Sequence, residues 1–328
     1  MEALLLGRRF VGVDLNPLSV FVSRVKTTPL ASLEVSGLLA WLARLPTSVN
    51  LHRLSNPAEA WSSYQRHIPW WLRKTLEQAL LSVNSLSSAN QRRFARGLLL
   101  QTAQRALDCR RDTPTKDEFI SVLKKNLSEM LHGISQFSAG LKASFGTTSA
   151  VYSHRRLLLR DARGVDNDRR IPRSWKPVRL VLTSPPYMGV HVLYHRWQVM
   201  SRRETAAPYW ISGLEDGHSS SFYTLGPRLQ REWSEYLVRL KEAFASVIAM
   251  MARGGHVVQL VGFSTPPRQI NAYLDALQSA GLEEVRVRSG LCGRLWREVP
   301  NRKWYAGVSD GGQGSKEVLL VHRKVGSS

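Results

Sequence analysis

A strand-forming run that ends in two prolines constrains this chain more than any other stretch. Residues 178–187 read Val-Arg-Leu-Val-Leu-Thr-Ser-Pro-Pro-Tyr. Proline has no N–H to give to a sheet ladder, so the strand must end near Ser184. Because the residue before a proline avoids helical geometry, Ser184 and Pro185 stay extended. The run therefore predicts a hydroxyl, backbone carbonyls and an aromatic ring at the carboxyl end of a buried strand, where ligands bind in open α/β sheets.

A second proline pair in the chain provides a comparison. Residues 257–263 form another apolar run, which is followed by Ser-Thr-Pro-Pro-Arg. This pair lacks the aromatic residue and leads into a helical pattern. It therefore predicts the start of a helix, where proline is well tolerated. By itself a proline pair marks only a turn or a boundary.

The net charge of the chain indicates which class of partner it binds. Its 328 residues include 46 lysines and arginines against 25 acidic residues, a formal net charge of +21. The basic residues are spread along most of the sequence, which favours a nucleic-acid-facing surface on a folded protein. No apolar run is long enough to cross a bilayer, and no signal-peptide pattern is present. We therefore expect a soluble, cytoplasmic protein that has no membrane partner.

Cysteine and histidine give no metal site. The two cysteines, Cys109 and Cys292, exclude a disulfide framework and a four-cysteine site. His191 and His195 have a four-residue spacing, but no carboxylate or cysteine lies at ligand spacing from them. We therefore predict no metal.

Helical and strand patterns divide the chain into three regions. Residues 1–27 contain a short strand and a helical stripe. Residues 28–150 are poor in strand signals, and Thr-Lys-Asp-Glu at 115–118 matches a capping box that opens a long helix. Residues 151–328 return to alternating strands and helices, including the motif. We predict an α/β domain that is interrupted at 28–150 by a helical insertion, a possible DNA-recognition region.

Two strands besides the motif strand end in a carboxylate. One ends at Asp14, in Gly-Val-Asp-Leu-Asn-Pro at 12–17, and the other precedes Asp161, in Leu-Arg-Asp-Ala-Arg at 159–163. A carboxylate at a strand tip can accept two hydrogen bonds from a ribose, as in nucleotide-binding α/β folds. Alternatively, Asp14 is an ordinary residue that caps the next helix.

Taken in this order, these segments resemble the S-adenosylmethionine-dependent DNA amino-methyltransferases. Thr-Ser-Pro-Pro-Tyr at 183–187 is similar to their (Ser/Asp/Asn)-Pro-Pro-(Tyr/Phe/Trp) motif, and the two acidic strand tips are similar to the second and third strands of the family. The resemblance covers residues 7–27 and about 156–323. It implies a Rossmann-like class I methyltransferase sheet in a protein of the α/β class, with the helical subdomain inserted and the first strand missing.

The resemblance also implies roles for individual residues. Catalytic positions are Ser184, Pro185, Pro186 and Tyr187: the Ser184 hydroxyl and the Pro185 carbonyl would accept hydrogen bonds from the target amine, and Tyr187 would stack on the flipped base. The cofactor S-adenosyl-L-methionine would contact Asp14 through its ribose and Asp161 through its adenine amine. Asn16 and Thr183 complete the predicted cofactor site.

One part of the family pattern is missing. The family has a first strand that ends in a Phe-x-Gly-x-Gly loop against the methionine part of the cofactor, and residues 1–10 do not supply it. The glycines at 311–314 and 254–255 precede strands and do not follow them. Three explanations remain open: a start placed too late, a second polypeptide that supplies the loop, or a chain that no longer binds cofactor normally.

The region after the motif interleaves aromatic and basic residues. This composition suits stacking of an unstacked base and contact with the nucleic-acid backbone, although a partly buried aromatic cluster would look the same. The predicted nucleic-acid contacts are His191, Tyr194, Arg196, Trp197, Arg202 and Arg203.

The function that these features favour is methyl transfer to an exocyclic amine of double-stranded DNA, as in restriction-modification systems. A serine before the proline pair is more usual in the cytosine-N4 enzymes, so cytosine N4 is the first expectation and adenine N6 the alternative. An RNA or protein amine methyltransferase is less well matched by Ser184. A non-catalytic nucleic-acid-binding relic or subunit is the alternative from another class. Methylation at cytosine C5 is disfavoured because neither cysteine follows a proline.

Overall fold

The structure is a computed structural model, in which the chain folds into two compact units. Described residues are 1–52, 61–187, 196–200, 203–217, 223, 225, 233–263, 266–286, 293–298 and 316–325. Unit 1 contains residues 1–159 and 193–216, and unit 2 contains residues 160–192 and 217–328.

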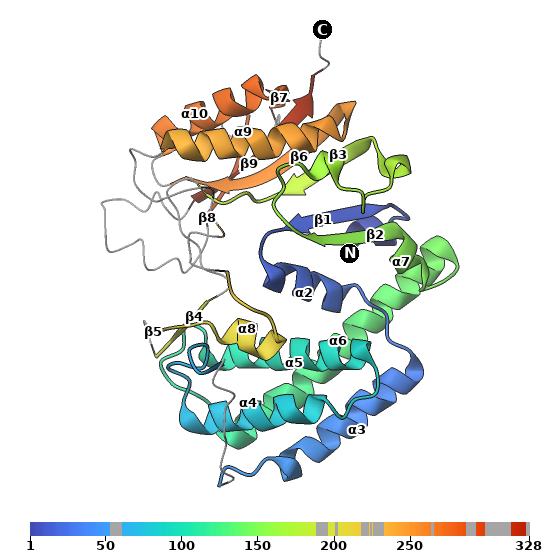
Figure 1. Cartoon of the computed structure of the whole chain (residues 1–328), viewed down its shortest axis with the longest axis vertical. Coiled ribbons are helices and arrows are strands. Elements are labelled where there is room, and N and C mark those ends of the chain that lie inside the picture. Colours follow the sequence, from blue (N-terminus) through green and yellow to red (C-terminus); the bar gives the residue numbers. More distant parts are fainter. Residues whose placement is uncertain are drawn as a thin grey trace. The chain divides into compact units, whose positions relative to one another are not determined.

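Unit 1 combines a small parallel sheet with a group of helices (Figure 1). Strands β1 (Phe10–Asp14) and β2 (Arg155–Leu159) pair in parallel, from Phe10 opposite Arg155 to Asp14 opposite Leu159. Strands β4 (Trp197–Val199) and β5 (Arg203–Thr205) form an antiparallel pair. The helices of this unit are α1 (Glu2–Leu5), α2 (Pro17–Lys26), α3 (Ser32–Ser48), α4 (Trp70–Val83), α5 (Ala89–Leu107), α6 (Lys116–Phe145), α7 (Ala150–His154) and α8 (Ala207–Ser212).

The capping box predicted at 115–118 is confirmed. Thr115 is the N-cap of α6, and its hydroxyl accepts a hydrogen bond from the Glu118 amide at 3.3 Å. In return, the Glu118 carboxylate accepts one from the Thr115 amide at 2.7 Å. The helix ends at Gly146, whose φ of 76° is readily adopted by glycine.

The predicted boundary at residue 27 lies inside one compact unit, which contains residues 1–159. Helix α2 packs on α5, where Gly97 lies so close to Val25 that an added Cβ would come within 2.9 Å of a Val25 methyl. The N-terminal strand and helix therefore share a hydrophobic core with the helices that follow. The compact unit also takes in residues 193–216.

Unit 2 is built on a mixed sheet with the strand order β3-β6-β9-β7, in which β8 also pairs with β9. Strand β3 runs parallel to β6, while β9 runs antiparallel to β6, β7 and β8. The strands are β3 (Val178–Thr183), β6 (Met251–Gly262), β7 (Leu282–Glu284), β8 (Leu295–Glu298) and β9 (Lys316–Lys324).

Helices α9 (Trp233–Ala249) and α10 (Pro266–Ser279) cover one face of this sheet (Figure 1). Alternate residues of the strands point toward them, as the period of two requires. The core includes Leu240 of α9, Tyr273 of α10, Val257 and Val261 of β6, and Val318 of β9, all with no exposed surface. Helix α10 begins at the second proline pair, as predicted. The fold class is therefore mixed α/β.

Candidate active site

The motif residues lie where the sequence predicts, directly after a strand. Strand β3 ends at Thr183, and the exposed Ser184 follows it. The Ser184 Oγ lies 3.1 Å from the Leu260 carbonyl oxygen and 3.1 Å from the Tyr187 hydroxyl oxygen. Because β3 and β6 are parallel, their carboxyl ends meet at one edge of the sheet, and this contact joins them there.

The hydrogen bonds of Ser184 and Tyr187 determine whether the Ser184 hydroxyl can accept a further hydrogen bond from a ligand. Tyr187 donates its proton to the Glu317 carboxylate at 2.9 Å. Ser184 has one proton, which goes either to the Leu260 carbonyl or to the Tyr187 oxygen. In both cases the Ser184 oxygen is the donor and retains lone pairs. The hydroxyl can therefore accept a hydrogen bond from a ligand amine.

The position of the Tyr187 ring depends on a glycine of the neighbouring strand. A Cβ added to Gly262 would lie 2.8 Å from Cδ2 and 2.9 Å from Cε2 of that ring. The ring thus packs directly on the backbone of β6. A second tyrosine holds the turn itself, because the buried Tyr236 donates to the Pro186 carbonyl at 2.7 Å. Burial raises the pKa of the Tyr236 hydroxyl well above its usual range, so it stays a donor.

Glu317 is a member of the site that our sequence analysis missed. It lies opposite Gly262 in the β6–β9 register and is 1% exposed. Besides Tyr187, it binds Arg297 of β8 through Nε at 2.7 Å and Nη2 at 2.6 Å. The paired Arg297 compensates for burying this carboxylate. The available signal was weak: a single acidic residue before the apolar run Val318–Val321.

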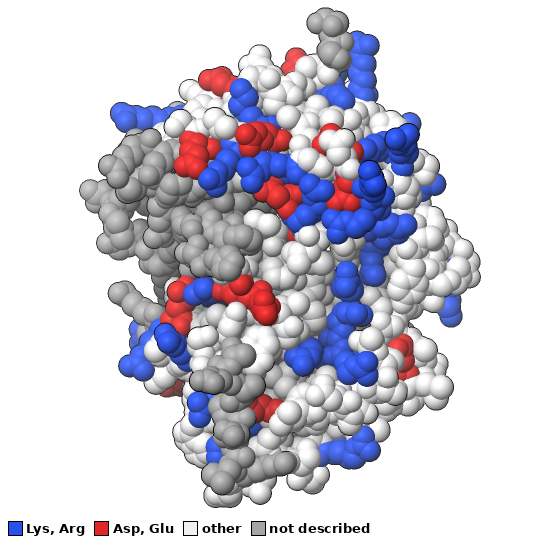
Figure 2. Space-filling model, in the orientation of Figure 1, with Lys and Arg blue, Asp and Glu red and all other residues white. Residues whose placement is uncertain are grey.

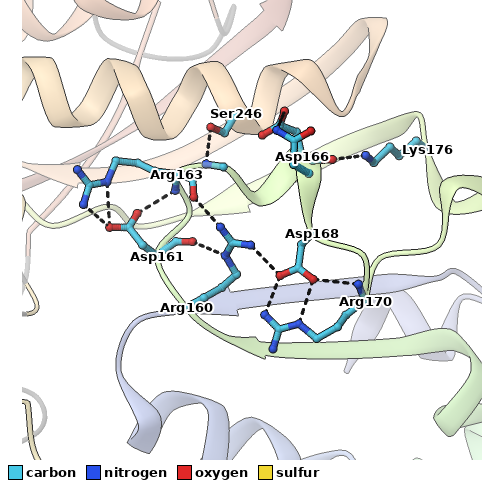
Figure 3. A network of polar contacts seen from close by, with 10 residues as sticks. Arg160, Asp161, Arg163, Asp166, Asp168, Arg170, Lys176 and Ser246 are labelled. Atoms are coloured by element: carbon cyan, nitrogen blue, oxygen red, sulfur yellow. Dashed lines mark hydrogen bonds and ion pairs between the residues drawn. The ribbon is translucent and has the colours of Figure 1, made fainter.

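Asp161 lies in the loop after β2, within unit 2, and is held by Arg163 (Figure 3). Its Oδ2 accepts from Arg163 Nη2 at 2.7 Å and Nε at 3.0 Å, and its Oδ1 accepts from the Arg163 amide at 2.8 Å. Partial burial raises the pKa of the Asp161 carboxyl, but these hydrogen bonds and the Arg163 charge outweigh it and lower the pKa. The group is therefore a permanent acceptor, with lone pairs left on Oδ1.

The rest of this loop is fixed by further polar contacts (Figure 3). Arg160 donates to the carbonyls of Asp161 and Arg163 and forms a 2.7 Å ion pair with Asp168. Hydrogen bonds from Arg170 and Arg160 hold the pKa of Asp168 well below its usual range. The Gly164 amide donates to the Ser246 hydroxyl of α9 at 2.8 Å. Asp161 is therefore presented on a loop with a defined shape.

Asp14 and Asn16 lie together in unit 1. The Asp14 Oδ1 accepts a hydrogen bond from the Asn16 amide at 2.8 Å, and Asn16, not Asp14, is the N-cap of α2. The Asn16 Oδ1 also accepts from the Tyr209 hydroxyl at 3.3 Å. Asp14 is exposed as a residue at the strand end, but its carboxyl is partly removed from water. This partial burial raises the pKa of the carboxyl, and hydrogen bonds from Asn16 and Ser19 offset only part of the rise.

The predicted nucleic-acid contacts have different environments. Trp197 is 2% exposed and belongs to the core of unit 1, so we withdraw it as a base-stacking residue. Arg196 is paired with Asp216 at 2.6 Å, which neutralises its charge. Arg203 is exposed on β5 and stays a predicted contact. His191, Tyr194 and Arg202 lie outside the described residues.

The described part of the chain offers neither a metal centre nor a membrane span. Within the described ranges, no group of three or more histidine, cysteine, aspartate or glutamate side chains is placed to hold a metal ion. No helix in that same part of the chain is both long and apolar enough to cross a membrane.

No protein-family model and no curated protein matches the chain. Among solved structures, the chain is similar to two crystal structures of a Thermus thermophilus protein, one a selenomethionine derivative, provisionally assigned as a DNA modification methylase. The TM-score is 0.28 and the identity 18% for both. The match covers 51% of this chain and 51% of the other in one case, and 52% and 53% in the second, so the chain spans about half the length of that protein.

Proposed function

We propose that the chain takes part in S-adenosylmethionine-dependent methylation of DNA, at the exocyclic amine of a flipped base, with cytosine N4 as the target. The observation that supports this best is the Ser184–Tyr187 turn. It places a hydroxyl with available lone pairs and an aromatic ring together at the carboxyl end of β3. This is the arrangement that the resemblance to the amino-methyltransferases implies.

The reaction needs positioning more than acid–base chemistry. The cofactor would supply a methyl group on a sulfonium, and the amine nitrogen would take it by direct displacement, in which the N–C bond forms as the S–C bond breaks and the electron pair of that bond returns to sulfur. Ser184 Oγ and the Pro185 carbonyl would accept the two amine hydrogens and so hold the nitrogen lone pair in line with the methyl. The amine proton is released to solvent after transfer. Flipping the base from the duplex costs a few kcal/mol.

Asp161 belongs to unit 2 and Asp14 to unit 1, and each is assigned to the cofactor on its own chemistry. Asp161 is held ionised and has lone pairs left on Oδ1 for an adenine amine. Asp14 offers a carboxylate at the end of β1 for ribose hydroxyls, and the Asn16 amide fixes its orientation. Thr183 is the last residue of β3, next to Ser184. The cofactor itself supplies the activated methyl group.

The glycine loop for the methionine part of the cofactor would come from a polypeptide segment other than the described residues. The outer edge of β3 is suited to receiving a strand. Among the described strands of unit 2, β3 pairs on one side only, with β6. The unpaired backbone N–H and C=O groups of such an edge can accept a further strand.

A double variant tests the proposal. Ser184→Ala with Tyr187→Ala removes the acceptor and the ring, and we expect methyl transfer to fall below detection while salt-dependent DNA binding persists. Ser279→Ala is the control, since it removes an exposed serine hydroxyl of α10 in the same unit. Transfer by the double variant at the control rate would refute the site. DNA binding without transfer in every preparation, including the unsubstituted chain, would favour the non-catalytic alternative.

A further inference from the structure

Unit 1 contains a cavity whose walls are dominated by arginine. Its volume is about 320 Å³, and Arg24, Arg93, Arg155 and Arg156 contribute to its lining, together with Thr28 and Tyr152. We call it the arginine pocket. Figure 2 shows lysine and arginine side chains gathered over the end of α2 and the start of α5, the elements that carry two of these arginines.

The arginine pocket is separate from the predicted cofactor residues of the same unit. Arg155 and Arg156 begin β2, and Arg155 lies opposite Phe10, the first residue of β1. Asp14 is the last residue of β1 and lies opposite Leu159. The two ends of the strand pair are therefore four residue steps apart, about 13 Å. The proposed methyl-transfer site does not use this pocket.

Three of the four pocket arginines, Arg24, Arg93 and Arg155, keep their charge without a carboxylate partner among the described residues. Arg155 uses Nη1 to hold the Thr27 carbonyl and hydroxyl oxygens, both at 2.5 Å. Arg93 uses Nη1 to reach the Asn90 amide oxygen at 3.1 Å. Each guanidinium has five N–H donors, so most of them stay available.

The arginines also act on one another. Burial and then repulsion from Arg24 lower the pKa of Arg93. The same causes lower the pKa of Arg155, with a further contribution from Arg93. A solvated basic face would avoid this cost by spreading its charges outward. Like charges that converge on a cavity are instead typical of an anion site, where a bound anion removes the repulsion.

We propose that the arginine pocket binds a phosphate group. Guanidinium forks match the oxygen geometry of phosphate, and three of them can surround one phosphoryl group. Tyr152, which is 54% exposed at the rim, offers a ring for the sugar or base attached to it. The phosphate belongs either to the backbone of a nucleic acid or to a free phosphate ester. The proposal does not depend on methyl transfer.

The test uses a paired substitution with a matched control. Arg24→Gln with Arg93→Gln removes two pocket charges and leaves Arg155 in place to hold Thr27. Arg44→Gln with Arg66→Gln removes the same charge from exposed positions of unit 1 that do not line the pocket. Inorganic phosphate and cytidine monophosphate are titrated calorimetrically, and binding to a 20-base-pair duplex is measured at several salt concentrations. Thermal unfolding confirms that both variants fold.

The outcomes separate the two sources of phosphate. We expect the pocket variant to bind phosphate or the nucleotide at least tenfold more weakly than the control variant. If the slope of log affinity against log salt for DNA also becomes shallower than the control's by about one per lost contact, the ligand is a backbone phosphate. If only phosphate and nucleotide binding change, the ligand is a free phosphate ester. Pocket and control variants that behave alike in both assays would overturn the proposal.

Discussion

The Tyr187 hydroxyl donates a 2.9 Å hydrogen bond to the buried carboxylate of Glu317, although 130 residues separate the two in the sequence. This contact connects the turn after β3 to the first residues of β9, and Arg297 of β8 holds the same carboxylate. The ring expected to stack on a base is thus anchored at its hydroxyl end. Glu317 acts on the proposed reaction only through Tyr187 and is a positioning residue.

We expect Tyr187→Phe and Glu317→Ala to be energetically coupled. Each change removes the same hydrogen bond, and bonds to a charged group contribute about 1.5–3 kcal/mol, so the double variant should be more stable than the sum of the two losses predicts. Chemical denaturation of the four proteins in the cycle measures the coupling. In the control cycle, Glu298→Ala replaces Glu317→Ala, because the Glu298 side chain on β8 is 79% exposed. Additive losses for Tyr187 and Glu317 would show that the bond does not anchor the ring.

Gly262→Ala should displace the Tyr187 ring, because the new methyl would lie 2.8 Å from Cδ2 of the ring. Overpacking of this kind costs about 1–3 kcal/mol of the free energy of unfolding. Gly133→Ala is the matched control, since nothing lies within 4 Å of its added Cβ, and alanine in the middle of α6 should stabilise the protein by about 0.5–1 kcal/mol. Thermal unfolding distinguishes the two. Equal effects would contradict the close packing of Tyr187 on β6.

His322 should make the stability of unit 2 depend on pH. It is 1% exposed, its Nδ1 lies 3.3 Å from the Gln259 amide nitrogen, and burial lowers its pKa from 6.5 to about 4. Because of the lowered pKa, the unfolded chain takes up the His322 proton at a higher pH than the folded protein does. The resulting stability is present above pH 6.5 and is lost as the pH falls through 4, by about 3 kcal/mol at most.

His322→Gln removes this titration, so between pH 6.5 and 4 the free energy of unfolding of the variant should fall less steeply than that of the unsubstituted chain. Urea denaturation at several pH values measures it. Parallel pH profiles for the two proteins would exclude His322 as the titrating group.

Thr115→Ala should lower the free energy of unfolding by about 1 kcal/mol, because it removes the N-cap of α6 and leaves the Glu118 amide without its partner. Thr113→Ala, two residues before the helix cap, makes the same chemical change without removing a cap. Denaturation curves of the two variants measure the difference. Equal stabilities would mean that the cap adds nothing to the long helix.

Local signals in the sequence predicted much of the fold. The long helix α6 (Lys116–Phe145) was predictable because its start depends on the Thr115 cap and the Glu118 side chain, which act within a few residues. Helix α3 was missed because Pro46 and Gly37 interrupt its pattern. Tertiary packing accounts for it: Gly37 allows the Gln91 side chain of α5 to reach the carbonyl of Glu34 at 3.0 Å.

The candidate site was predicted only in part, for the same reason. The motif turn is local, so its position after β3 followed from the prolines. Glu317 could not be assigned to Tyr187, because only the β6–β9 register brings them together. Trp197 was misassigned because its basic and aromatic neighbours describe a nucleic-acid surface and a buried cluster equally well; packing in unit 1 buries it.

The most direct test of the proposed function is transfer of labelled methyl from S-adenosylmethionine to unmethylated duplex DNA, followed by nucleoside analysis. The assay is run on this chain and on an extended version, which is expressed with any in-frame codons that precede Met1 in the gene. We predict label in N4-methylcytosine in at least one preparation; label in N6-methyladenine would correct the base alone. No labelled nucleoside from either preparation, although both still bind DNA, would contradict the proposal.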